Sequence, residues 1–149
     1  MSEYPLPYQS TDLTGQVAFV TGTTAGLGKR FAQVLAACGA KVIVTGRRVD
    51  RLEALSAEIN ASGGQAAPVA VDMTDRSSIR NALKAAEDLF GTVTILVNNA
   101  GIPDAQRAVK MDDELMDAVF ETNLIGPWVL SVEVAKRLIA AERPGRIVN

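Results

Sequence analysis

Short apolar runs alternate along the chain with longer segments in which apolar residues recur every three or four positions. The runs are rich in β-branched residues and do not alternate strictly with polar ones, as expected of parallel strands that helices cover on both faces. They occupy residues 17–21, 41–45, 67–71, 95–98 and 146–149. This order predicts βαβ units that combine into a doubly wound parallel α/β sheet.

The first segment between runs is predicted to be a helix that ends at Gly39. Four positions share its apolar face: Phe31, Val34, Leu35 and Cys38. Cys38 is the single cysteine, and among apolar neighbours we expect a buried structural thiol. One cysteine and no histidine exclude an intrachain disulfide, the usual zinc sites and Ser-His or Cys-His catalytic pairs.

The second helical segment has Leu52, Leu55 and Ile59 on its apolar face. Asp50 is followed three residues later by Glu53, which resembles a capping box. We therefore expect Asp50 to cap this helix.

The third helix is predicted to follow Asp75, with four apolar positions spaced four, three and four apart: Ile79, Leu83, Ala86 and Phe90. The last helical segment covers residues 112–141 and contains Gly126-Pro127. Because proline lacks an N–H group and clashes with the preceding turn, a break or kink into two pieces is expected there.

The composition is that of one globular unit. The 149 residues are 48% hydrophobic, which suits one core, and we expect a tail over residues 1–14 and one domain over residues 15–149. No window holds the roughly 18 apolar residues of a membrane-spanning helix, and the first residues lack the features of a signal peptide. A net charge of -2 without a basic block argues against nucleic acid. The expectation is a cytoplasmic protein.

The first apolar run leads directly into a glycine-rich loop with the pattern Thr21-Gly22-x-x-x-Gly26-x-Gly28. Gly22 allows the chain to turn off the strand, Gly26 leaves room for a pyrophosphate, and Gly28 lets the helix pack tightly on the sheet. The start of the helix then offers free N–H groups to an anion. The loop predicts a phosphate-binding site, with a plain strand-to-helix turn as the simpler alternative.

Two other glycine patterns do not fit this loop. A P-loop would need glycine at Thr23 and serine or threonine at Arg30. The common G-x-G-x-x-G pattern would need glycine at Thr24 and Leu27.

Further motifs, together with this loop, resemble the short-chain dehydrogenase/reductase family, in its single-domain branch, over essentially the whole chain. Residues 98–101 resemble the NNAG motif, Asp72 resembles the aspartate that meets the adenine, and Asn123 lies where the family has its active-site asparagine. Each residue also has a structural alternative. Asp72 could cap a helix, the asparagine pair could link loops, and Asn123 could bond free carbonyls at the helix break.

The resemblance implies a Rossmann-like fold and a nicotinamide dinucleotide beyond the carboxyl ends of the strands, where ligands of doubly wound sheets lie. The residues that it assigns to the cofactor are Gly22, Thr24, Ala25, Gly26, Leu27, Gly28, Arg47, Arg48, Asp72, Met73, Asn99, Ala100 and Gly101. No metal is expected.

The residues after the second strand predict which cofactor is preferred. NAD sites place an acid about 20 positions after the glycine loop, whereas this chain has Gly46-Arg47-Arg48. A missing carboxylate removes repulsion of a 2'-phosphate, which an arginine can bind bidentately. NADP is therefore favoured over NAD, although Ala25 stands where many NADP-using relatives have a second basic residue. A pair of solvated arginines is the alternative.

The resemblance implies hydride transfer between nicotinamide and an alcohol or carbonyl carbon, assisted by serine, tyrosine, lysine and asparagine. Only the asparagine, Asn123, is matched. The two tyrosines, Tyr4 and Tyr8, lie near the N-terminus, and neither has a lysine four residues later. Because the family's other catalytic residues follow the fifth strand, we expect this sequence to be the N-terminal part of a longer enzyme and to be inactive alone.

A homodimer or homotetramer of the full chain is also implied, because the helix that carries Leu130, Val134 and Leu138 resembles the family's subunit-contact helix. The loop over residues 102–110 is expected to form one wall of a pocket for a small alcohol or carbonyl substrate. Two other functions stay open. One is a non-catalytic NADP-binding module, and a distant third is an S-adenosylmethionine-dependent methyltransferase, which has no need of the NNAG motif or Arg47.

Overall fold

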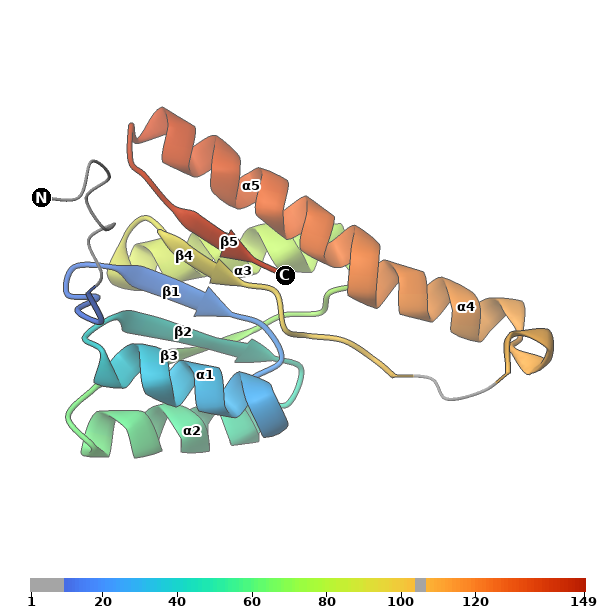
Figure 1. The fold of residues 1–149 in the computed structure, drawn as a ribbon, viewed down its shortest axis with the longest axis horizontal. Helices are drawn as coiled ribbons and strands as arrows, with labels where there is room; N and C mark the ends of the chain where they lie inside the picture. The colour runs from blue at the N-terminus through green and yellow to red at the C-terminus, as the bar shows by residue number, and fades with distance from the viewer. Residues whose placement is uncertain (1–9, 104–106) are drawn as a thin grey trace, which may run out of the picture.

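The computed structural model describes residues 10–103 and 107–149 and contains one parallel sheet in the order β3-β2-β1-β4-β5 (Figure 1). Its strands are β1 (Val17–Val20), β2 (Lys41–Gly46), β3 (Gln65–Ala70), β4 (Ile95–Val97) and β5 (Arg146–Val148). The five predicted strands and their parallel, doubly wound arrangement are confirmed, with strand ends that differ by one or two residues.

Helices cover both faces of the sheet. On one face lie α1 (Gly26–Ala37) and α2 (Val49–Ala61), and on the other lie α3 (Arg76–Phe90) and α5 (Gly126–Ala140) (Figure 1). Side chains of β1 and β2 alternate between two cores: Val20 and Val42 point toward α1 and α2, whereas Phe19 and Ile43 point toward α3 and α5. A fully buried side chain of this size stabilises the fold by about 1.5–3 kcal/mol.

The chain order reverses next to β1. From β1 the chain passes to β2 and β3 on one side, then returns to β4 and β5 on the other, so β1 pairs with both β2 and β4. Val20 and Val97 are register partners at the ends of β1 and β4. In an open α/β sheet such a reversal leaves a crevice beyond the carboxyl ends of the strands.

Helix α1 packs on the sheet with its smallest residues, and the apolar face predicted for it is wrong. Its buried positions are Gly28, Ala32 and Ala36. Phe31 and Val34 are 39% and 42% exposed, while Leu35 and Cys38 are half-buried. The helix lies so close to the glycine loop that a Cβ at Gly28 would collide with the carbonyl oxygen of Gly22. Only small residues fit so close an approach, and Cys38, the C-cap, is not the fully buried thiol that was expected.

The start of α2 also differs from the prediction. Arg48 is its N-cap, and Asp50 lies within the first turn without a hydrogen bond that caps the helix, so no capping box forms. The Asp50 charge still lies near the positive end of the helix dipole. The apolar face of α2 is buried as predicted, with Leu52, Leu55 and Ile59 in the core.

Helix α3 begins as predicted. Asp75 is its N-cap, and the Asp75 carboxylate accepts a hydrogen bond of 2.7 Å from the Ser77 amide. Ile79, Leu83 and Ala86 are buried, and Phe90 packs against the same core.

The last helical segment follows a 3₁₀ turn, η1 (Ala108–Lys110), and is continuous through the predicted break. Helix α4 (Asp113–Phe120) passes into a π-helical turn, η2 (Glu121–Ile125), and then into α5. The Gly126 N–H group donates to the Glu121 carbonyl oxygen, five residues back. The irregularity therefore precedes Gly126-Pro127, and the proline, which cannot donate a bond to the preceding turn, directly follows the π-helical turn.

Helix α5, which is expected to resemble a subunit-contact helix, packs on the sheet through Leu130, Val134 and Leu138, which belong to the core. The exposed large apolar side chains of α4, η2 and α5 are Met116, Phe120, Leu124, Trp128 and Ile139. The homodimer or homotetramer expected from the sequence stays a prediction.

Within residues 10–103 and 107–149, no helix is both long and apolar enough to cross a membrane. The same part of the chain holds no group of three or more His, Cys, Asp or Glu side chains that could bind a metal ion.

Candidate functional site

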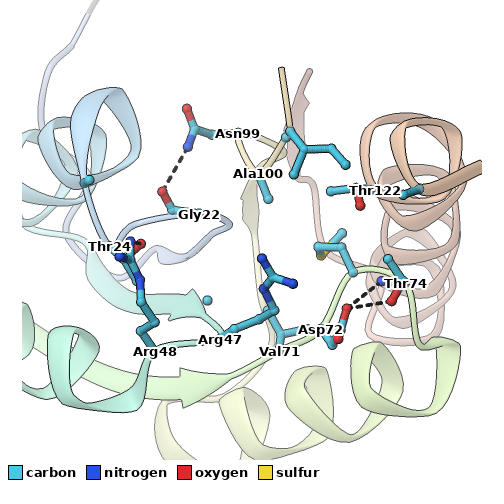
Figure 2. Close-up of a pocket in the computed structure, with 16 residues that line it drawn as sticks. Gly22, Thr24, Arg47, Arg48, Val71, Asp72, Thr74, Asn99, Ala100 and Thr122 are labelled. Carbon is cyan, nitrogen blue, oxygen red and sulfur yellow. Dashed lines mark hydrogen bonds between the residues drawn. The ribbon is translucent and has the colours of Figure 1, made fainter. Parts of the chain in front are cut away.

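A cavity of about 510 Å³ lies beyond the carboxyl ends of the strands, where the chain order reverses (Figure 2). Its size is within the range of small-molecule sites, about 300–1,000 Å³. Many residues assigned to the cofactor from the sequence line it: Gly22, Thr24, Ala25, Arg47, Arg48, Asp72, Met73, Asn99, Ala100 and Gly101. The fold thus brings together segments that are far apart in the sequence.

Three assigned residues of the glycine loop do not line the cavity. Leu27 is 69% exposed, and Gly28 is buried where α1 contacts the loop. Gly26 has a φ of +59°, and a Cβ there would meet no atom within 4 Å. Gly26 thus leaves open space at the start of α1.

Gly22 allows the glycine loop and the NNAG segment to touch. Its φ is +71°, and a Cβ on Gly22 would lie 2.8 Å from the Ala100 Cα atom. A side chain at this position would both strain the backbone and separate the two loops.

Thr21 joins the same two loops through hydrogen bonds. Its buried hydroxyl oxygen accepts hydrogen bonds of 2.9 Å from the Asn99 and Ala100 amides. The Asn99 side-chain amide donates in return to the carbonyl oxygens of Thr21 and Gly22, at 3.0 and 3.2 Å. Asn99 therefore links loops, as its structural alternative supposed. Thr21 was not assigned to the site, although the Thr-Gly pattern was the signal that marked it.

The N-terminus of α1 faces the loop with unused hydrogen-bond donors. Its N-cap is Ala25, which has no side chain that can accept a bond from the first turn. Four backbone N–H groups at the start of a helix lack helical partners, and together with the helix dipole they favour an anion.

Two arginines come from the end of β2. Arg48 reaches the glycine loop, where its Nη2 atom donates a 2.7 Å hydrogen bond to the Thr24 hydroxyl (Figure 2). Arg47 points into the cavity between this loop and Asp72 (Figure 2). The cavity therefore has positive charge on the side of β2.

Asp72 organises the turn between β3 and α3. Its Oδ1 atom accepts hydrogen bonds from the Thr74 amide and hydroxyl, at 2.9 and 2.8 Å. The bond from the Thr74 amide, followed by that from the hydroxyl, holds the pKa of Asp72 below its ordinary value, and Arg47 adds to the effect. The alternative role as the cap of α3 is wrong, because Asp75 has that position.

Asn123 does not line the cavity. Its Oδ1 atom accepts from the Ile102 amide at 2.9 Å, and its Nδ2 atom donates to the Ile102 carbonyl oxygen at 3.0 Å. The expected alternative, a bond to free carbonyls at the helix break, is wrong, because both polar atoms of the Asn123 side chain bond the Ile102 backbone. Asn123 instead fixes the segment that follows the NNAG motif.

Asn98, the first residue of that motif, connects β4 with its neighbours. Its Nδ2 atom donates to Ser131 Oγ at 3.0 Å and to Asn149 Oδ1 at 2.8 Å. Asn98 therefore holds the ends of β4 and β5 next to α5, as a structural link.

Part of the cavity comes from residues that sequence reasoning missed: Gly46, Val71, Thr74, Ala118 and Thr122. Ala118 and Thr122 belong to α4 and η2, where no motif marks them and only the packing of the helix reveals their role. Of the wall predicted over residues 102–110, Ile102 lines the cavity, and residues 104–106 lie outside the described residues.

A family model described as short chain dehydrogenase matches residues 16–149. Galactitol 2-dehydrogenase of Agrobacterium fabrum is 39% identical over 92% of this chain and 52% of its own. The 3-oxoacyl-(acyl-carrier-protein) reductase of Escherichia coli is 38% identical over 91% of this chain and 54% of its own. The chain spans about half the length of these curated relatives.

Solved structures have the same fold. A metagenomic short-chain oxidoreductase in complex with NADP superposes with a TM-score of 0.85 at 37% identity, over 93% of this chain and 62% of that one. A short-chain type dehydrogenase/reductase from Mycobacterium marinum superposes with a TM-score of 0.87 at 32% identity, over 92% of this chain and 54% of that one.

Proposed function

The chain belongs to the short-chain dehydrogenase family, and from this membership we propose that it forms the cofactor-binding part of an NAD(P)-dependent oxidoreductase. The proposed reaction transfers hydride between nicotinamide and an alcohol or carbonyl substrate. The observation that carries the proposal is the cavity at the reversal of strand order, lined by the glycine loop, the NNAG segment and Arg47.

The glycine loop suits a pyrophosphate. Gly26 leaves open space beside the uncapped N-terminus of α1, where backbone N–H groups would bind the phosphate oxygens. The small side chain of Ala25 keeps that approach free. Gly22 and Gly28 contribute indirectly, because they allow the loop to contact the NNAG segment and α1.

We propose NADP as the preferred cofactor, with NAD as the weaker ligand. Arg47 lies in the cavity, Arg48 is held at its edge by Thr24, and Gly46 leaves no carboxylate to repel a 2'-phosphate. The bound NADP of the metagenomic relative supports this choice. Arginine suits phosphate because its planar guanidinium can donate two parallel hydrogen bonds.

When bound, the nicotinamide supplies the carbon that accepts or donates hydride. The proposed role of Asn123 in this chain is to hold the Ile102 segment, since both atoms of its side-chain amide bond the Ile102 backbone. The family's serine, tyrosine and lysine have no counterpart among the motifs of these 149 residues. We therefore propose that the 149-residue chain binds the cofactor without turnover, and that a longer protein carries the activity and forms a homodimer or homotetramer.

The test is a fluorescence or calorimetric titration of the purified 149-residue protein with NADPH and NADH. The expected result is micromolar binding of NADPH, weaker binding of NADH, and no oxidation of either with a panel of ketones. Arg47→Ala should weaken the binding of NADPH at least about tenfold, because one charge-assisted bidentate contact is lost, and should leave the binding of NADH unchanged. A protein that binds neither dinucleotide would overturn the proposal.

The same titration separates the alternatives. Turnover of a ketone by the 149-residue protein would contradict the proposed inactivity. Tight NADPH binding by a longer natural chain that stays inactive with every alcohol and ketone would favour a non-catalytic binding module. Displacement of NADPH by S-adenosylmethionine would favour the methyltransferase alternative.

A further inference from the structure

Gly126, the first residue of α5, touches the turn that Asp72 organises. Gly126 is buried, and a Cβ there would collide with the Met73 carbonyl oxygen and lie 3.1 Å from the Glu121 carbonyl oxygen. Its φ of -56° and ψ of -54° are ordinary helical values that any residue adopts. The glycine is therefore required by the close approach of the two backbones and not by its own conformation.

The turn is fixed on its other sides as well. The Ser78 hydroxyl accepts a 3.0 Å hydrogen bond from the Asp72 amide, and the Thr74 amide and hydroxyl bond the Asp72 carboxylate. The Met73 side chain is buried in the core beneath α5. The contact with Gly126 thus sets how far this turn stands from the helical segment.

The gap between the turn and the helical segment belongs to the cavity. On the helical side the cavity is lined by Thr122, four residues before Gly126, and by Ala118, eight residues before it. On the side of the turn it is lined by Val71, Asp72 and Thr74. Figure 2 shows Thr122 on the helical segment next to Thr74 and on the opposite side of the cavity from Gly22 and Thr24. Gly126 does not line the cavity itself, so its contact with Met73 acts on the spacing of these two sides from behind the cavity wall.

The chemistry of this gap differs from that of the phosphate side. Val71, Ala118 and Ile102 are apolar, and the polar groups are the Asp72 carboxylate and the hydroxyls of Thr74 and Thr122. Arg48 and the start of α1 belong to the other walls, and Arg47 lies between the glycine loop and Asp72. A slot of this kind suits a flat, uncharged heterocycle with a few hydrogen-bonding atoms and does not suit a phosphate.

We infer that Gly126 is a positioning residue for the cofactor: its contact with Met73 sets the width of the slot between the Asp72 turn and the wall of Ala118 and Thr122, where the family resemblance already implies the adenine. This inference rests on the proposed function, because it takes the ligand to be a dinucleotide. Since protein interiors are close-packed, a Cβ at Gly126 must move either the turn or the helix, and the slot changes width. Sites lose affinity when their walls shift by roughly 0.5 Å.

The test compares Gly126→Ala with the wild-type protein in titrations with NADPH and with 2',5'-ADP, which has the base and lacks the nicotinamide. Both ligands should bind at least about tenfold more weakly to the variant, by a similar factor, because the changed contact lies at the base. Alanine favours a helix more than glycine does, so helix propensity cannot explain a loss of affinity. In a variant that stays folded, such a loss therefore reports a shift between the Asp72 turn and the helix. The Thr74 amide, which bonds Asp72, should also exchange its hydrogen faster in the ligand-free variant.

Leu124→Ala is the matched control, because Leu124 lies in the π-helical turn two residues before Gly126, is 56% exposed and does not line the cavity. It should bind both ligands like the wild type. If Gly126→Ala does not fold, Thr122→Leu decides the question, since it narrows the slot from a partly exposed position and should weaken both ligands about tenfold.

Three results would overturn the inference while the proposed function stands: wild-type affinity in a folded Gly126→Ala protein, an equal loss in Leu124→Ala, or a loss for NADPH without one for 2',5'-ADP. In the absence of a folded Gly126→Ala protein, wild-type affinity in Thr122→Leu would overturn it too. A wild-type protein that binds neither ligand would instead refute the proposed function.

Discussion

The cavity has two walls that are built in different ways. On one side, the glycine loop and the NNAG segment follow neighbouring strands and are joined by hydrogen bonds of Thr21 and Asn99. On the other side, the Asp72 turn and the helical segment of Ala118 and Thr122 come from distant parts of the chain. Gly126 places them next to each other by a close contact of backbones.

The difference shows how each wall depends on the sequence. The first wall uses short contiguous motifs, because in the proposed function glycines and backbone amides bind the ligand and must follow the strand ends at fixed spacing. The second wall uses ordinary side chains at helical spacing, and nothing in their identity marks them. Single substitutions of motif residues in the first wall should therefore cost more stability than substitutions of the side chains that line the second wall, apart from Gly126, where two backbones meet.

The largest effect on stability is expected at Gly22. Gly22→Ala should lower the free energy of unfolding by about 2–4 kcal/mol, because it adds strain at positive φ to a clash with Ala100. Chemical unfolding followed by circular dichroism measures the loss. Gly26→Ala is the control: it has a similar φ but open space around the Cβ, so the loss should be near 1 kcal/mol, together with weaker NADPH binding. Equal losses at the two sites would show that the contact between the loops does not matter.

A smaller effect is expected from the hydrogen bonds between the two loops of the first wall. Thr21→Val keeps the shape but leaves the Asn99 and Ala100 amides without their acceptor, which should lower the free energy of unfolding by about 1–3 kcal/mol. Thr23→Val is the matched control, because this buried hydroxyl only donates, to the Thr45 carbonyl oxygen, which also accepts from the Thr23 amide. Urea unfolding of both variants gives the comparison, and a greater loss in Thr23→Val would contradict the role of Thr21.

The smallest effect is expected at the second wall, from the charge of Asp72. Because folding lowers the Asp72 pKa, the ionised carboxylate stabilises the fold above the ordinary carboxyl pKa, and this contribution is lost as pH falls through the lowered folded value. At pH 7, Asp72→Asn should lower stability by less than about 1 kcal/mol, since the group is partly exposed. The difference should disappear on acidification. An NMR titration of the Asp72 carboxyl carbon with a midpoint at or above the ordinary value would refute this explanation.

The sequence predicted the parallel sheet, because the apolar runs were separated by segments of helical period. It predicted the side of the cavity where Gly22, Asn99 and Arg47 follow strand ends. It failed where two faces of a helix were both apolar. In α1 the buried face is the one with Gly28, Ala32 and Ala36, and periodicity alone favoured the neighbouring face with bulkier side chains.

The amino-acid sequence by itself thus determined the strands, their connections and the glycine loop, because these depend on local pattern and on residues a few positions apart. The tertiary structure alone decided which small residues meet. It placed Gly28 on the glycine loop and Gly126 on the Met73 carbonyl oxygen, and it brought Ala118 and Thr122 to the cavity. The physical reason is that close packing selects residues by the distance between backbones, a distance that exists only once the sheet and helices have assembled.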